Sequence, residues 1–301
     1  MKVMWIRLLS ALFAGLLAFQ EVPALTRDDV KSLADDKPVE WVCPMDRDVR
    51  AKSPGKCPRC GMPLVAGIPE FSEFAMKIRT NPKAIRAGVT TAMTFEVIDP
   101  RTRKRVNDFE VVHEKLFHLF LVSQDLKFFA HEHPVLDKSG EFHFDWKFPQ
   151  AGMYRVLTDY YPKGATPQLT ANTLFVAGAP VTQAPPVKLV ADLAPQKSEN
   201  LTASLTMDPP EPLAGFKTLL FFDLNPGDGL EPYLGAWGHM LAASEDLVDL
   251  IHNHPFLADG GSRVQFNLIF PRAGMYRVWV QFQRKGVVNT VAFNIPVAEL
   301  K

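Results

Sequence analysis

The amino-acid sequence predicts a mainly β protein: a small cysteine-rich module followed by two copies of a β-sandwich. Three observations support this. From residue 70 onward, short apolar runs such as "TAMTFEVI" alternate with turn-forming residues about every ten positions, which is typical of sandwiches. The stretch "HLFLVSQDLKFFAHEHP" (118–134) matches "HMLAASEDLVDLIHNHP" (239–255) without a gap. All cysteines of the chain lie between residues 41 and 65.

The N-terminus has the features of a secretory signal peptide. Basic residues precede an apolar run from Leu8 to Phe19, and a small-residue site ends at Ala24. The run is short for a membrane span. We expect residues 1–24 to be removed, leaving 25–39 as a linker of an exported protein without a membrane span. The predicted location is the periplasm or the exterior, and an uncleaved membrane anchor is the alternative.

The overall charge argues against nucleic acid as a partner. Lys plus Arg number 33 and Asp plus Glu number 33, so the formal net charge is zero. Nucleic-acid binding depends largely on an excess of basic side chains. With 47% hydrophobic and 22% charged residues, the composition is that of an ordinary globular protein.

The cysteine segment, residues 40–67, has the ligand spacing of a metal site. It contains "WVCPMDRDVRAKSPGKCPRCGMPLV", with Cys43, Cys57 and Cys60 as its thiols. An odd number of cysteines in an exported protein cannot all pair as disulfides. Ligation of one metal ion by all three is one explanation, and a Cys57–Cys60 disulfide with a lone Cys43 is the other.

A closed tetrahedral site requires a fourth ligand. Asp46 lies three positions after Cys43 and could ligate through a carboxylate oxygen. The thioether of Met45 or Met62 is an alternative fourth ligand, and soft sulfur ligands favour ions such as Cu(I) or Ag(I). The expected cofactor is therefore a copper or zinc ion.

This segment resembles the small heavy-metal-binding domain of copper- and silver-efflux adaptors and of some metal-pumping P-type ATPases. That domain has the pattern C-P-M-H-P, a spacer, and P-G-K-C-P-x-C-G-M-x-L, and the resemblance covers about 25 residues here. The chain departs from it at Asp46 and Arg47, where the family has His and Pro. The resemblance implies metal handling. A purely structural zinc staple for a segment too small to have a core is the other interpretation.

Two immunoglobulin-like sandwiches are predicted at 70–178 and 200–301, with a Pro-rich linker at 179–199. The repeat of about 120 residues corresponds to a duplicated domain. Both copies also contain F-P-x-A-G-M-Y-R-V. We expect Tyr154 and Tyr276 in this motif to bond back to the preceding turn, as in a tyrosine corner.

Six histidines occupy equivalent places in the two repeats, and they form two tentative metal sites: His118, His131 and His133 in the first copy; His239, His252 and His254 in the second. Side chains alternate along a strand, so the two histidines of each H-x-H share a face, and the first histidine pairs across from them. Imidazole nitrogen suits copper, zinc and nickel. Structural hydrogen bonding of the rings is the alternative.

The repeats also weakly resemble secreted β-sandwich domains that accompany bacterial copper-handling proteins. The sequence contains no nucleophile elbow, phosphate-binding loop or dinucleotide fingerprint, and we expect no enzymatic activity. The predicted function is metal capture or homeostasis outside the cytoplasm, possible partners being another envelope protein or a metal-efflux protein. The alternative is an envelope interaction protein with a structural zinc staple.

Overall fold

The computed structural model describes residues 40–46, 49–67, 72–178 and 188–300. The predicted signal peptide 1–24, the linker 25–39 and part of the Pro-rich linker lie outside these residues. The described residues form strands and turns without a helix, as the sequence predicts. None of them forms a helix of the length and apolar character needed to cross a bilayer.

The cysteine module is a three-stranded antiparallel sheet with strand order β2-β1-β3. Its strands are β1 (Trp41–Val42), β2 (Arg50–Ala51) and β3 (Val65–Ala66). The module buries its own three cysteines with Met62 and Leu64, and Val112 and Tyr161 of the first sandwich complete this cluster. Such a segment has too little apolar area for an independent core, which explains the zinc-ribbon-like architecture.

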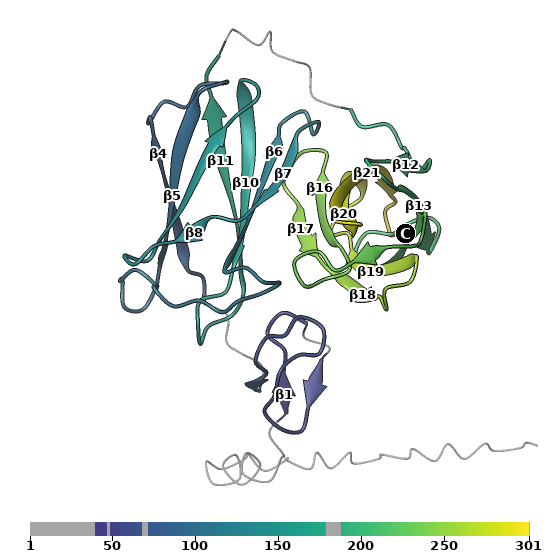
Figure 1. Ribbon diagram of the computed structural model, residues 1–301, viewed down its shortest axis with the longest axis horizontal. Coiled ribbons are helices and arrows are strands. Elements are labelled where there is room, and N and C mark those ends of the chain that lie inside the picture. The colour runs from purple at the N-terminus through teal and green to yellow at the C-terminus, as the bar shows by residue number, and fades with distance from the viewer. Residues whose placement is uncertain (1–39, 47–48, 68–71, 179–187, 301) are drawn as a thin grey trace, which may run out of the picture. The chain divides into compact units, whose positions relative to one another are not determined.

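The first sandwich has two four-stranded sheets, ordered β4-β5-β9-β8 and β11-β10-β6-β7 (Figure 1). Its strands are β4 (Ala75–Asn81), β5 (Thr90–Ile98), β6 (Phe117–Ser123), β7 (Phe129–Glu132), β8 (Val135–Leu136), β9 (Glu141–Lys147), β10 (Gly152–Tyr160) and β11 (Gln168–Val176). In chain order these sheets correspond to strands A-B-E-D and G-F-C of an immunoglobulin fold, with an additional strand beside C.

The second sandwich repeats this topology, with sheets β12-β13-β14-β19-β18 and β15-β20-β16-β17, and β21 paired to β20. Its strands are β12 (Gln196–Lys197), β13 (Thr202–Asp208), β14 (Lys217–Asn225), β15 (Leu230–Glu231), β16 (His239–Ser244), β17 (Leu250–Asn253), β18 (Pro255–Leu257), β19 (Arg263–Ile269), β20 (Gly274–Arg284) and β21 (Val287–Val297).

The described end of the predicted linker, residues 188–199, is bonded to the second sandwich. Asp192 and Asn294 exchange two backbone hydrogen bonds of 3.0 Å, and β12 pairs with β13 at the edge of the sheet. Apolar Leu189 packs against the cluster that joins the sandwiches. Residues 188–199 of the predicted linker are therefore hydrogen-bonded to and packed against the second sandwich.

Strands β6 and β16 are buried on both faces, whereas β5 and β14 show the alternation of strands with one face in a core. One face of each doubly buried strand packs into its own sandwich. The other contributes to a third cluster drawn from both copies: Phe120, Val122, Leu126, Leu157, Leu241, Ala243, Leu247 and Trp279. The continuous apolar runs in these two strands are thus explained by contact between the sandwiches.

Each F-P-x-A-G-M-Y-R-V motif forms the turn that leads into a central strand. The Tyr154 hydroxyl donates to the Gln150 carbonyl at 3.0 Å. The Tyr276 hydroxyl lies 2.9 Å from an Asp249 carboxylate oxygen and 3.1 Å from the Arg272 carbonyl. Both rings are fully buried.

Replacing Tyr154 with Phe should lower the free energy of unfolding by about 0.5–1.5 kcal/mol, because one net hydrogen bond is lost while the ring stays in place. Tyr276→Phe should cost more, since its hydroxyl also contacts a carboxylate. Urea unfolding of both variants measures the difference. No loss in either variant would show that these hydroxyls do not stabilise the turn, and equal losses would contradict the added contribution of the Asp249 contact.

Candidate metal centres

The three thiols and Asp46 converge on one point of the cysteine module. One ligand atom from each of Cys43, Asp46, Cys57 and Cys60 lies within 4.8 Å of all the others. The Cys43 and Cys60 sulfur atoms are 3.5 Å apart. An Asp46 carboxylate oxygen lies 3.5 Å from the Cys57 sulfur and 3.9 Å from the Cys43 sulfur. No disulfide joins the three thiols.

These spacings suit a tetrahedral ion. Zinc–thiolate bonds of about 2.3 Å place two sulfur ligands about 3.8 Å apart along a tetrahedral edge. The 3.5 Å separation of the Cys43 and Cys60 sulfur atoms is close to that edge. The other Asp46 oxygen accepts a hydrogen bond of 3.1 Å from Arg59, which orients the carboxylate toward the thiols.

The backbone around Cys57 and Cys60 forms a tight turn. Gly61 has a φ of 75°, in the left-handed region that costs a side-chain-bearing residue energy. Its N–H donates to the Cys57 carbonyl at 2.9 Å, and the Cys57 N–H donates to the Met62 carbonyl at 2.7 Å. The turn directs both sulfur atoms inward. In the first half of the site, the Asp46 N–H points at the Cys43 sulfur from 3.2 Å.

The pKa values of the three thiols differ. Hydrogen bonding from Cys60, aided by the Asp46 N–H, lowers the pKa of Cys43 to about 6 despite its burial. The same contact with Cys43, together with burial, raises the pKa of Cys60. Burial raises the pKa of Cys57. The three thiols therefore differ in how readily they lose a proton, and a bound ion must displace the proton of each thiol that still carries one.

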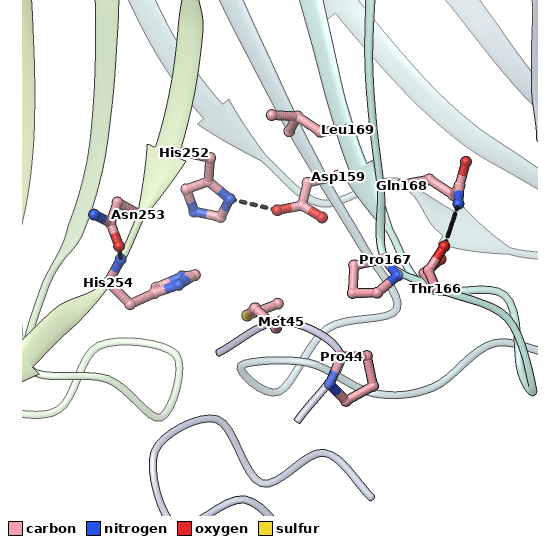
Figure 2. A pocket seen from close by; sticks show the side chains of 10 residues that line it. All are labelled: Pro44, Met45, Asp159, Thr166, Pro167, Gln168, Leu169, His252, Asn253 and His254. Carbon is pink, nitrogen blue, oxygen red and sulfur yellow. Dashed lines mark hydrogen bonds and ion pairs between the residues drawn. The ribbon is translucent and has the colours of Figure 1, made fainter. Parts of the chain in front are cut away.

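The two methionines predicted as alternative ligands take different positions. Met62 is fully buried among the cysteines. Met45 packs at the edge of that cluster and also lines a cavity of about 280 Å³ with Asp159, His252 and His254 (Figure 2). The thioether of Met45 thus lies between the cysteine module and the histidines of the second sandwich.

The first histidine set is gathered as the sequence predicts. Single nitrogen atoms of His118, His131 and His133 lie within 4.8 Å of one another. Strands β6 and β7 pair Phe120 with His131, which places His118 beside His133. His118 and His131 are almost fully buried, and the Nδ1 atom of His118 lies 3.1 Å from the Nε2 atom of His131.

The second set has the same arrangement. His239, His252 and His254 also offer one nitrogen each within 4.8 Å. Met240 pairs with Asn253, so His239 lies beside His254. The His252 Nδ1 donates to an Asp159 carboxylate oxygen at 2.6 Å, which crosses from one sandwich to the other. Burial raises the pKa of Asp159, but the bond from His252 more than offsets it, and the pKa lies below its ordinary value.

The two sets lie in contact with each other. Ring centroids of His118 and His252 are 5.6 Å apart, and those of His131 and His239 are 5.4 Å apart. A seventh ring joins them, because His113 stacks on His254 at 3.7 Å. The sequence comparison left His113 unmatched, since Leu234 occupies its place in the second copy. Unmatched His143 lies at the surface, bonded to Asp137 at 2.9 Å.

This geometry defines a metal-binding protein made of a thiolate module and two β-sandwiches. A model described as a heavy metal binding domain matches residues 40–66, which confirms the resemblance drawn from the cysteine motif. The chain belongs to the family described as a domain of unknown function, DUF8832, whose model matches residues 72–176 and again residues 186–299. The comparison with curated proteins found no match.

Solved structures with similar chains include bacterial adhesins. The Escherichia coli adhesin FdeC is 15% identical over 79% of this chain and 68% of its own, with a TM-score of 0.26. The Yersinia pseudotuberculosis adhesin InvE is 10% identical over 74% of this chain and 60% of its own, with a TM-score of 0.25. The fibronectin(III)-like modules of Clostridium thermocellum CbhA give 8% identity, 74% and 95% coverage and a TM-score of 0.21.

Metal-free protein should lose stability as the pH falls below about 6.5. Burial, reinforced by neighbouring rings, lowers the pKa of His118 to about 4 and those of His113 and His133 to about 3. Unfolded histidine titrates near 6.5, so between that pH and the folded pKa the unfolded chain binds more protons. Each such ring then costs about 1.4 kcal/mol per pH unit. Urea unfolding at pH 7.5 and 5.5 measures this loss, and an unchanged midpoint would contradict the burial of these rings.

Proposed function

We propose that the protein is exported to the periplasm or the cell exterior, where it captures copper or zinc. Cys43, Cys57 and Cys60 supply three thiolates, and Asp46 supplies the fourth ligand. The observation that carries the proposal is the convergence of these four donors within 4.8 Å in a segment that a heavy-metal-binding model matches. A leader of signal-peptide type supports export.

Thiolate ligands favour copper in its monovalent state, and zinc is the competing ion. The replacement of the family's His by Asp46 adds a hard oxygen to three sulfurs, so the preference between the two ions is the quantity to measure. We propose capture as a binding function rather than an enzymatic one.

The experiment is metal analysis of untagged protein from the envelope fraction, purified without oxygen, followed by competition of Cu(I) against Zn(II) in the presence of chelators of known affinity. The proposal is supported if each cysteine module binds one copper or zinc ion. It also requires that Asp46→Ala abolishes this binding or lowers the affinity for the ion at least tenfold. Protein confined to the cytoplasm, or a module that retains neither ion, would contradict it.

A structural staple is the second candidate function, favoured by the packing of Val112 and Tyr161 against the cysteines. In that case the ion would anchor the module to the first sandwich for the benefit of a protein partner. Chelation separates the two: a staple would release an ion only on unfolding of the module, whereas a capture site would exchange its ion with the module still folded.

A further inference from the structure

In the second histidine set, three ring nitrogens have no hydrogen-bond partner. In its neutral form His252 donates its Nδ1 proton to the Asp159 carboxylate, which can only accept, and its Nε2 then carries a lone pair. His239 donates its Nε2 proton to the Tyr233 carbonyl at 2.8 Å, so its Nδ1 carries a lone pair. His239 Nδ1, His252 Nε2 and His254 Nε2 are buried without a hydrogen-bond partner. These three atoms are available to hold one cation.

The first set offers the equivalent atoms. His118 donates its Nε2 proton to the Val112 carbonyl at 3.0 Å, which leaves a lone pair on Nδ1. The Nδ1 of His131 lies 2.8 Å from Gln281 Oε1, and the Gln281 amide nitrogen is bonded to Thr290. The His131 Nε2 then bears a lone pair that faces the lone pair of His118 at 3.1 Å. His133 Nε2 is buried without a partner.

Two lone pairs this close repel unless a cation or a proton lies between them. Turning the Gln281 amide would supply such a proton in the first set, because His131 could then donate from Nε2. The second set has no such alternative, since Asp159 replaces the amide and fixes the proton of His252 on Nδ1. The second set is therefore the clearer of the two metal sites.

Each sandwich supplies a side chain that orients a histidine of the other sandwich. Asp159 lies opposite His118 in the register of β10 with β6, and Gln281 lies opposite His239 in the register of β20 with β16. Asp159 and Gln281 therefore occupy equivalent positions in the two copies. Asp159 bonds to His252 of the other copy, and Gln281 bonds to His131 of the other copy. Metal-ligating histidines are commonly oriented in this way by a carboxylate, an amide or a carbonyl on the second ring nitrogen.

We propose that the two histidine sets form one dinuclear copper centre, assembled where the duplicated sandwiches meet. His118 Nδ1, His131 Nε2 and His133 Nε2 hold one ion, and His239 Nδ1, His252 Nε2 and His254 Nε2 hold the other. The centre lies outside the cysteine module and adds two ions to the one proposed there.

The charge around the six histidine rings favours the monovalent state of copper. The six imidazole ligands bring no negative charge, and among the described residues a single carboxylate, that of Asp159, is hydrogen-bonded to these rings. Burying two divalent ions beside one negative charge would be costly, whereas two Cu(I) ions bring half as much positive charge into the site. Imidazole binds copper well, and Met45, which lines the cavity beside His252 and His254, offers the soft thioether that Cu(I) prefers.

The experiment counts ions by native mass spectrometry of the full mature chain titrated anaerobically with Cu(I). Three ions are expected in the unaltered protein and two in Cys57→Ser/Cys60→Ser. His133→Leu/His254→Leu should keep the ion of the cysteine module and bind the histidine ions at least tenfold more weakly. The exposed His143→Leu is the matched control and should bind three ions.

A second readout separates ligation from a structural role. In metal-free protein, His133→Leu/His254→Leu should be at least as resistant to urea as the unaltered chain, because it removes buried nitrogens that lack partners. A count of one ion, or two ions of which only one requires histidine, would overturn the proposal. Full ion binding by the variant, or its marked destabilisation without metal, would do the same.

Discussion

Cys57→Ser/Cys60→Ser should abolish metal binding by the cysteine module and leave both sandwiches folded. Two of the four converging donors are removed, and serine hydroxyls do not replace thiolates as ligands of a soft ion. Structural zinc sites contribute about 10–16 kcal/mol of binding free energy, which becomes folding free energy of the module itself. The sandwiches have separate clusters of buried side chains and do not depend on it.

Metal content and limited proteolysis together measure this outcome. The control is Lys52→Ser/Lys56→Ser, which changes two exposed residues of the same module. The control should keep its ion, and the cysteine variant should lose it while proteolysis removes only the region near residues 40–67. An ion retained at the module of the cysteine variant would exclude Cys57 and Cys60 as the ligands that hold it.

Trp279→Ala should weaken the contact between the sandwiches and lower the free energy of unfolding by about 3–5 kcal/mol, the usual cost of deleting a buried aromatic ring. Trp279 is 3% exposed and stacks on Phe129 of the other sandwich, with ring centroids 5.2 Å apart and planes 12° apart. Urea unfolding should change from one transition to two. The two histidine sets are held together by the same contact, so they should no longer lie against each other.

Trp279→Leu is the matched variant, because Leu157 occupies the equivalent place in the first copy and is itself buried in the same cluster. It should retain part of the stability and a single transition. Trp146→Ala, at a partly buried residue packed against the core of the first sandwich alone, controls for loss of any tryptophan. If Trp279→Ala still unfolds in one transition at unchanged urea concentration, the sandwiches are not joined by this cluster.

The sequence was sufficient for features that depend on local pattern or on repetition. The thiol spacing predicts a metal site in the cysteine segment, and the family match confirms the kind of module. Alternating apolar residues predict strands, and the duplicated motifs predict two equivalent sandwiches. The pairing of His118 beside His133 follows from the parity of a hairpin.

The association of the two copies could not be predicted in this way. Hairpin parity places three histidines on one face but does not say what that face contacts, and here it meets the same face of the other copy. The bond from His252 to Asp159 joins residues 93 positions apart, and that from His131 to Gln281 joins residues 150 apart. Such pairs depend on docking of whole sheets. The histidines of the two sets were chosen because they recur in both copies. His113 does not recur, since Leu234 is at the corresponding place in the second copy, and sequence comparison therefore could not add it to the site.

The most direct test of thiolate capture is X-ray absorption at the metal edge. His133→Leu/His254→Leu loaded with a single equivalent of copper or zinc confines the ion to the module around Cys43, Cys57 and Cys60. The expected spectrum is dominated by sulfur neighbours at about 2.3 Å. A first coordination sphere of nitrogen and oxygen alone would contradict the account.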